Sequence, residues 1–118
     1  MTPVRHTVPM PYDDELAERV RAVVAAEPAL TEKRMFGGLA FLVHGHMAVA
    51  ASSQGGLLLR VDPAEAESLL GPSVTRFVMR GRELTGWLDV GPAAITTDEA
   101  LRGWVAHGLA YARSLPPK

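Results

Sequence analysis

The chain has 118 residues, of which 47% are hydrophobic and 21% charged, with a formal net charge of −1 and no cysteine. This length predicts one domain with a single core, and the nearly neutral charge provides no overall field that would attract nucleic acid or an anionic membrane. The lack of cysteine excludes disulfides, thiolate metal sites and a cysteine nucleophile. No apolar run is long enough to span a bilayer, and the first residues lack the apolar core of a signal peptide, so we expect a cytoplasmic protein.

The N-terminal residues 1–11 contain three prolines and no apolar periodicity, which predicts a flexible tail ahead of a single domain at 12–118. Met10 is a second candidate for the true start, because organised sequence begins directly after it. A first helix is expected with Asp13 as its cap and with Pro28 ending it. Its apolar side chains fall on one stripe, at Leu16, Val20, Val23 and Val24.

The stretch 31–51 organises the rest of the chain. Alternation from Leu39 to Val43 predicts a strand whose two faces are both apolar, which indicates cover on at least part of each face. His44-Gly45 is expected to form a hairpin turn, since both residues tolerate positive φ better than most. Met47 to Ala51 then returns as the partner strand, and a further short strand is possible near Lys33–Phe36.

The second half continues this pattern of strands and helices. Leu57 to Val61 is predicted as a third strand, and Asp62-Pro63 starts a short helix that ends at Gly71-Pro72. Val74 to Arg80 and Leu84 to Val90 are expected to form a hairpin through Gly81.

Thr96 and Glu99 have the spacing of a capping box, which predicts the start of the last helix. Its apolar stripe consists of Leu101, Trp104, Val105, Gly108, Leu109 and Ala112. The whole order predicts the α+β class: an antiparallel sheet of about five strands, flanked by N- and C-terminal helices and one short helix.

The chain resembles the TfoX/Sxy N-terminal domain family from about Tyr12 to Lys118. Four stretches carry this resemblance: the lead-in 31–38 (TEKRMFGG), the hairpin 41–47 (FLVHGHM), Gly86-Trp87, and the helix 101–105 (LRGWV) running into 112–116 (ARSLP). The resemblance implies a YjbR-like fold and a regulatory role. Similar domains in some bacteria regulate natural competence together with a cyclic-AMP receptor protein. Those regulators carry a second, C-terminal domain, so we expect a stand-alone member here, and the family supplies no catalytic residues.

Two motifs invite a ligand hypothesis. His44 and His46 have the i, i+2 spacing that would align two imidazoles on a strand, but a turn at Gly45 would separate them, so we expect no metal site. Gly37-Gly38 could admit a small anion beside Lys33 or Arg34, although the pair has neither phosphate-loop nor dinucleotide fingerprint, and a β-bulge explains it more simply.

The basic residues concentrate on the predicted strands and their loops. Together with the two glycines, they form the candidate interaction or anion surface: Lys33, Arg34, Gly37, Gly38, Arg60, Arg76 and Arg80. If one sheet face is uncovered, these cations could converge on it as a nucleic-acid footprint. Scattered strand arginines can equally just keep sheet edges from pairing with other chains.

No catalytic constellation is recognisable in the sequence. Ser52 and Ser53 have no evident base, His107 stands alone on the last helix, and Trp87 and Trp104 are expected to be core anchors. We therefore predict a non-enzymatic regulatory or adaptor domain without a cofactor, acting through a protein partner or self-association. Binding of nucleic acid by the strand arginines, or of a small anion near Gly37-Gly38, is the alternative.

Overall fold

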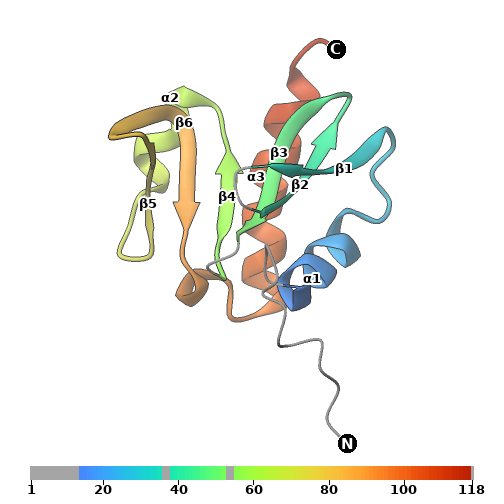
Figure 1. Cartoon of the computed structure of the whole chain (residues 1–118), viewed down its shortest axis with the longest axis horizontal. Coiled ribbons are helices and arrows are strands. Elements are labelled where there is room, and N and C mark those ends of the chain that lie inside the picture. The colour runs from blue at the N-terminus through green and yellow to red at the C-terminus, as the bar shows by residue number, and fades with distance from the viewer. Residues whose placement is uncertain (1–13, 36–37, 53–54, 118) are drawn as a thin grey trace, which may run out of the picture.

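The structure is a computed structural model, and it describes residues 14–35, 38–52 and 55–117. Within these ranges one antiparallel sheet contains six strands in the order β1-β2-β3-β4-β6-β5 (Figure 1). The strands are β1 (Leu30–Met35), β2 (Gly38–Val43), β3 (His46–Ser52), β4 (Leu57–Arg60), β5 (Val74–Met79) and β6 (Arg82–Val90). The prediction of about five strands is close, and the additional strand is β1, of which only the end had been considered.

Three helices complete the α+β fold, which confirms the predicted class. They are α1 (Asp14–Val24), α2 (Pro63–Ala66) and α3 (Asp98–Ser114), with 3₁₀ turns at Glu67–Leu69 and Pro92–Ile95. In Figure 1 the long helix α3 runs behind β3 and β4 and leaves the front of these strands uncovered by any labelled helix. None of the described helices is long and apolar enough to cross a membrane.

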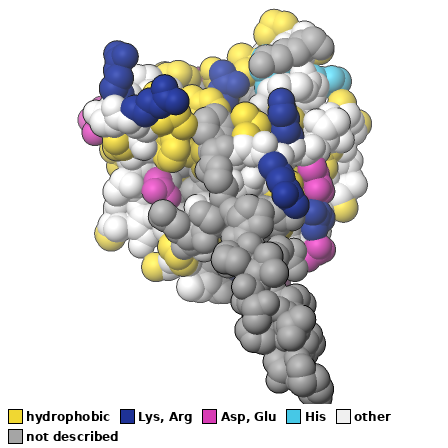
Figure 2. Space-filling view, viewed as in Figure 1, with side chains coloured by type: hydrophobic (Ala, Val, Ile, Leu, Met, Phe, Trp, Pro, Cys, Tyr) yellow, Lys and Arg dark blue, Asp and Glu magenta, His cyan; other side chains and the backbone are white. Residues whose placement is uncertain are grey.

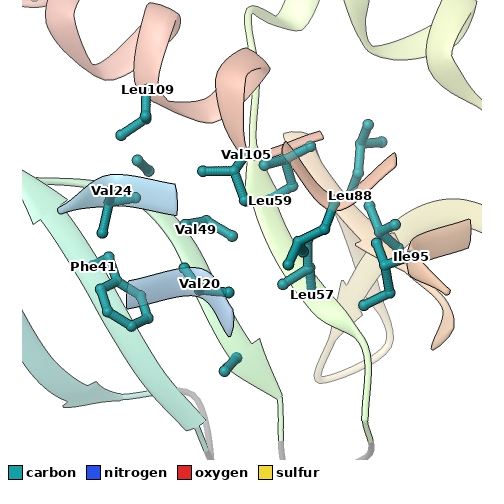
Figure 3. Close-up of a cluster of buried hydrophobic side chains, with 14 of the residues drawn as sticks. Val20, Val24, Phe41, Val49, Leu57, Leu59, Leu88, Ile95, Val105 and Leu109 are labelled. Atoms are coloured by element: carbon teal, nitrogen blue, oxygen red, sulfur yellow. The ribbon is translucent and has the colours of Figure 1, made fainter. Parts of the chain in front are cut away.

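The main core lies between the helices and one face of the sheet (Figure 3). Phe41, Leu57, Leu59 and Leu88 are fully buried there, against Val105 of α3. Both predicted helical stripes are confirmed, since the following helix residues belong to this cluster: Leu16, Val20, Val24, Leu101, Val105, Leu109 and Ala112. Burial of this apolar area, at roughly 25 cal/mol per Å², is the main force that holds the helices on the sheet.

Two tight hairpin turns set the strand register. His44-Gly45 joins β2 to β3 with φ values of 52° and 84°, and Arg80-Gly81 joins β5 to β6 with φ values of 55° and 78°. Positive φ at both central residues is the geometry of the type I′ turn, whose twist matches that of antiparallel strands. The predicted hairpin at His44-Gly45 is therefore confirmed.

Capping side chains begin two of the helices. The Asp62 carboxylate accepts a hydrogen bond from the Ala64 backbone N–H at 2.9 Å, as predicted for α2. The cap of α3 is Thr97, whose hydroxyl accepts from the Ala100 N–H at 3.1 Å. The expected box of Thr96 and Glu99 is thus wrong by one residue, because two adjacent threonines offer the same capping chemistry.

Helix α3 packs directly on the backbone of β3. At Gly108 an added Cβ would stand 2.4 Å from the Ala48 carbonyl oxygen and 2.9 Å from a methyl of Leu59. Only glycine permits so close an approach of helix to strand.

The sheet opens between β3 and β4 beyond their short ladder, which joins Val49–Ala51 to Leu57–Leu59. Arg60 continues β4 in register with Trp87 of β6 and has no partner position on β3 in this ladder. The C-terminal part of α3 reaches this opening, because the ring of Tyr111 lies 5.4 Å from the Arg60 guanidinium carbon.

Candidate functional site

A second apolar cluster occupies the other face of the sheet. Its buried members are Ala40, Met47, Ala50 and Leu58, and all of them are strand residues. Partly buried side chains surround them: Met35, Leu42, Phe77 and Trp87. No residue of the described helices belongs to this cluster, so we call the surface the open face. The alternation predicted in β2 is confirmed, because Leu39, Phe41 and Val43 lie in the helix-side core while Ala40 and Leu42 lie in this cluster. Of the two faces, only the first is covered by described helices.

Cations border the open face. Lys33 is paired with Ala40 in the β1–β2 ladder, and Arg60 is paired with Trp87, so both project to the side of the second cluster. Figure 2 shows this side of the molecule, with Lys and Arg side chains beside the gathered hydrophobic ones. An apolar centre with a charged rim is the usual anatomy of a protein-binding surface.

A hollow of about 440 Å³ continues the open face toward the β5–β6 turn. Met79, Leu84 and Trp87 supply apolar lining, and Arg80, Arg82, Glu83 and Thr85 supply the polar lining. Nearby, Val78 is 53% exposed, the highest exposure of any large hydrophobic side chain in the described ranges. The hollow gives the open face a place in which a side chain of another molecule could be held.

Arg60 stabilises the aromatic border of this surface. Its guanidinium carbon lies 5.3 Å from the ring centroid of Trp87 and 5.4 Å from that of Tyr111. Each contact is a cation–π interaction, which favours a fixed position for the guanidinium between the two rings. Arg60 therefore connects the open face to the end of α3 and is not simply a solvated charge.

The strand cations predicted as one surface are divided between two faces. Arg34 is paired with Leu39, and Arg76 with Leu88, and both partners belong to the helix-side core. Lys33 and Arg60 point to the open face, and Arg80 stands in the β5–β6 turn. The division follows from strand alternation, because adjacent residues such as Lys33 and Arg34 project to opposite sides.

The structure describes only one glycine of the predicted pair. Gly37 lies outside the described residues, while Gly38 is buried and opens β2 opposite Met35 and Ser52. A Cβ at Gly38 would stand 2.2 Å from the Ala51 carbonyl oxygen, so strand packing explains this glycine. The bulge expected at Gly37-Gly38 falls partly outside the described residues, and a register shift in the β2–β3 ladder lies between Phe41 and Leu42.

The two histidines of the hairpin face different partners. His46 Nε2 lies 2.6 Å from the Pro116 carbonyl oxygen, while His44 lines a cavity beside Glu27. Among the described residues no group of three or more His, Asp or Glu side chains is placed to hold a metal ion.

The other residues considered from the sequence divide in the same way. Trp104 packs on the helix-side core, as expected for an anchor, with its ring centroid 6.0 Å from that of His107. Trp87 packs on the second cluster instead, so the sequence interpretation missed its place on the open face. Its pairing with an arginine on a neighbouring strand could not be read from the sequence. Ser52 is the last residue of β3, and Ser53 lies outside the described residues.

Comparisons with known proteins agree with the resemblance that the motifs indicated. No curated protein matches the sequence. The family profile described as the TfoX N-terminal domain matches residues 22–112, which include α3 up to Ala112 and the whole sheet. The match covers well over half of the chain, and we conclude that this protein belongs to the TfoX N-terminal domain family.

Proposed function

We propose that this domain is a non-enzymatic regulatory adaptor that acts by binding another protein through its open face. The observation that carries the proposal is the second apolar cluster, with Phe77 and Trp87 partly exposed over a layer of buried strand residues. Apolar side chains gathered on a face without a covering helix are typical of an interaction surface. Membership of the TfoX N-terminal domain family supports a regulatory role, linked to transcription or competence.

The charges around the face suggest the chemistry of the partner. Among the described residues, four cations lie on this face and its hollow: Lys33, Arg60, Arg80 and Arg82. They outnumber the acidic Glu83 of the hollow and Asp89, which is paired with Leu58 of the second cluster. We therefore expect a partner segment with apolar side chains and an acidic border, because complementary charges steer and orient association. A nucleic-acid footprint is less well supported, because Arg34 and Arg76 project to the other side of the sheet.

Site-specific photo-crosslinking in cells tests this proposal. A photoreactive phenylalanine analogue at Phe77 should capture a partner, while the same group at Trp104 should not. The two positions are both partly buried aromatics, but they lie on opposite sides of the sheet. The charge reversal Lys33→Glu should weaken capture, whereas Arg102→Glu on the exposed surface of α3 should leave it unchanged.

The crosslinked products distinguish the possible outcomes. A distinct second polypeptide captured at position 77 and lost with Lys33→Glu supports the adaptor. Products containing only two copies of this chain would identify a self-interface and contradict the adaptor role. Equal capture at positions 77 and 104, or no capture at either, would also contradict it.

A further inference from the structure

A separate cavity of about 410 Å³ lies on the helix side of the molecule. It is formed by the end of α1 and the loop after it, the β2–β3 turn, and the last turns of α3. Its apolar lining consists of Val23, Ala26, Pro28 and Leu109, and its polar lining of Glu27, His44 and Arg113. A volume in the range of roughly 300–1,000 Å³, apolar walls and a few convergent polar groups are characteristic of small-molecule sites.

One of the lining residues is a nearly buried carboxylate. The Glu27 side chain is only 6% exposed, and both of its oxygens accept hydrogen bonds from Arg113 Nε, at 3.2 and 3.1 Å. Arg113 Nη2 donates to the same carboxylate. The hydrogen bonds from Arg113 lower the pKa of Glu27, and the charges of Arg113 and His44 add to this effect, while burial opposes it. Glu27 is therefore an anion that holds one edge of the guanidinium in place.

Two other groups that line the cavity keep donors for a further molecule. Arg113 is 54% exposed, and no described residue accepts a hydrogen bond from its Nη1. The ring of His44 also makes no hydrogen bond with a described residue. A guanidinium has five N–H donors in a plane, so an arginine that binds one carboxylate along its Nε edge can bind a second along its outer edge.

The backbone beside the cavity adopts an unfavourable conformation. The described part of the chain has three non-glycine residues with positive φ, and two of them are here: Ala29 at 61° and His44 at 52°. They are joined by a hydrogen bond from the His44 N–H to the Ala29 carbonyl oxygen, at 3.2 Å. The positive φ of His44 belongs to the type I′ turn between β2 and β3, and this turn places the residue among those that line the cavity.

We propose that this cavity binds a small organic monocarboxylate. The outer edge of Arg113 and the ring of His44 would donate hydrogen bonds to its carboxylate, and the walls around Leu109 would contact its short apolar body. A planar carboxylate matches the geometry of the guanidinium edge. The negative charge of Glu27 leaves at most one surplus positive charge at the site, which favours a monoanion over a dianion such as phosphate.

Amide NMR titration of the full chain with butyrate tests this site. Butyrate should give saturable shifts at residues 26–29, 44–45 and 109–113, with a dissociation constant in the millimolar range. Butyramide has the same shape without the charge, and inorganic phosphate has the charge without the apolar body. Neither should reproduce these shifts.

Four variants locate the binding without disturbing the fold. His44→Asn keeps a residue that the type I′ turn favours, yet removes the imidazole, and it should raise the dissociation constant about tenfold through the lost charge-assisted hydrogen bond. The control His107→Asn removes an exposed histidine of α3. Ala26→Leu should block binding by filling the cavity, while Ala25→Leu changes its exposed neighbour, which does not line the cavity.

Each alternative result decides against the proposal. Equal binding of butyrate by the wild type and by both His44→Asn and Ala26→Leu would place the ligand elsewhere. Equal binding of butyramide would reduce the site to an apolar hollow, and tighter binding of phosphate would contradict the carboxylate. Absence of saturable shifts would overturn the site itself. None of these results bears on the open face, so this inference and the adaptor proposal can fail independently.

Discussion

The ion pair of Glu27 and Arg113 joins two segments of the domain that are far apart in the sequence. The two residues are 86 positions apart, and their contact ties the loop after α1 to the last turn of α3. The burial of the Glu27 side chain makes this contact stronger than a surface pair, although the half-exposed Arg113 reduces its net contribution. A second bidentate pair, between Arg21 and Glu32, joins α1 to β1 at 2.8 and 3.0 Å.

The first prediction concerns pH. The pKa of Glu27 is lowered from an ordinary value near 4.5, so its ion pair stabilises the fold fully above that value and loses its effect as the pH falls through the folded pKa. Glu27→Gln should lower the free energy of unfolding at pH 7 by about 1–2 kcal/mol, because a hydrogen-bonded charge is replaced.

Urea unfolding at pH 7 and at pH 3 measures this effect, and the difference between wild type and Glu27→Gln should shrink at pH 3. The exposed Glu67→Gln is the matched control, and it should change little at either pH. A difference for Glu27→Gln that is the same at both pH values would contradict the assigned ion pair.

Helix α3 makes a close contact with the sheet at Gly108. Gly108 faces the backbone of β3, whereas an added Cβ at Gly103 would meet nothing within 4 Å. The two glycines therefore stand on the same helix in opposite packing environments, and this contrast allows an internal comparison.

The second prediction uses this pair. Gly103→Ala should stabilise the domain by about 0.5–1 kcal/mol, because alanine has the higher helix propensity. Gly108→Ala should destabilise it by about 1–3 kcal/mol despite the same gain, since the new methyl overlaps the Ala48 carbonyl. Thermal unfolding of both variants measures the contrast, and equal shifts in Tm would refute the close approach.

The elements of this fold were largely predictable because their signals are local. Asp62-Pro63, His44-Gly45 and the stripe of α3 each act within a few residues, and the structure confirms all three. Strand β1 (LTEKRM) was underestimated, because four of its six residues are exposed at the sheet edge and apolar alternation is absent.

The surfaces of the whole molecule were far less predictable, because they depend on contacts between distant segments. Nothing in the sequence placed Glu27 beside Arg113, and the pocket on the helix side was therefore missed. The strand cations were grouped by sequence, although pairing with Leu39 and Leu88 turns Arg34 and Arg76 away from Lys33 and Arg60. The face on which a strand side chain lies depends on the register of that strand with its neighbours, and this register is set by the complete sheet.

The strand order also has a kinetic consequence. Four of the neighbouring pairs in the sheet are consecutive along the chain, and only β4 and β6 are not. The pairing of β4 with β6, which we call the seam, requires the segment 61–86 to close into a loop. Closing this loop costs more chain entropy than closing a two-residue turn. The meander β1–β4 and the hairpin β5–β6 should therefore form first and dock along Leu57–Arg60 late in folding.

Stopped-flow kinetics would reveal this order of events. Arg60→Ala, at a position paired with Trp87 across β4–β6 and without a partner position in the β3–β4 ladder, should mainly accelerate unfolding, while Val43→Ala in the meander should mainly slow refolding. If the seam variant instead slowed refolding and Val43→Ala accelerated unfolding, the seam would belong to the folding nucleus and the predicted order would be wrong. If the predicted order holds, the two halves of the open face are brought together only in the last step, so a partly folded chain would not yet present that surface to a partner.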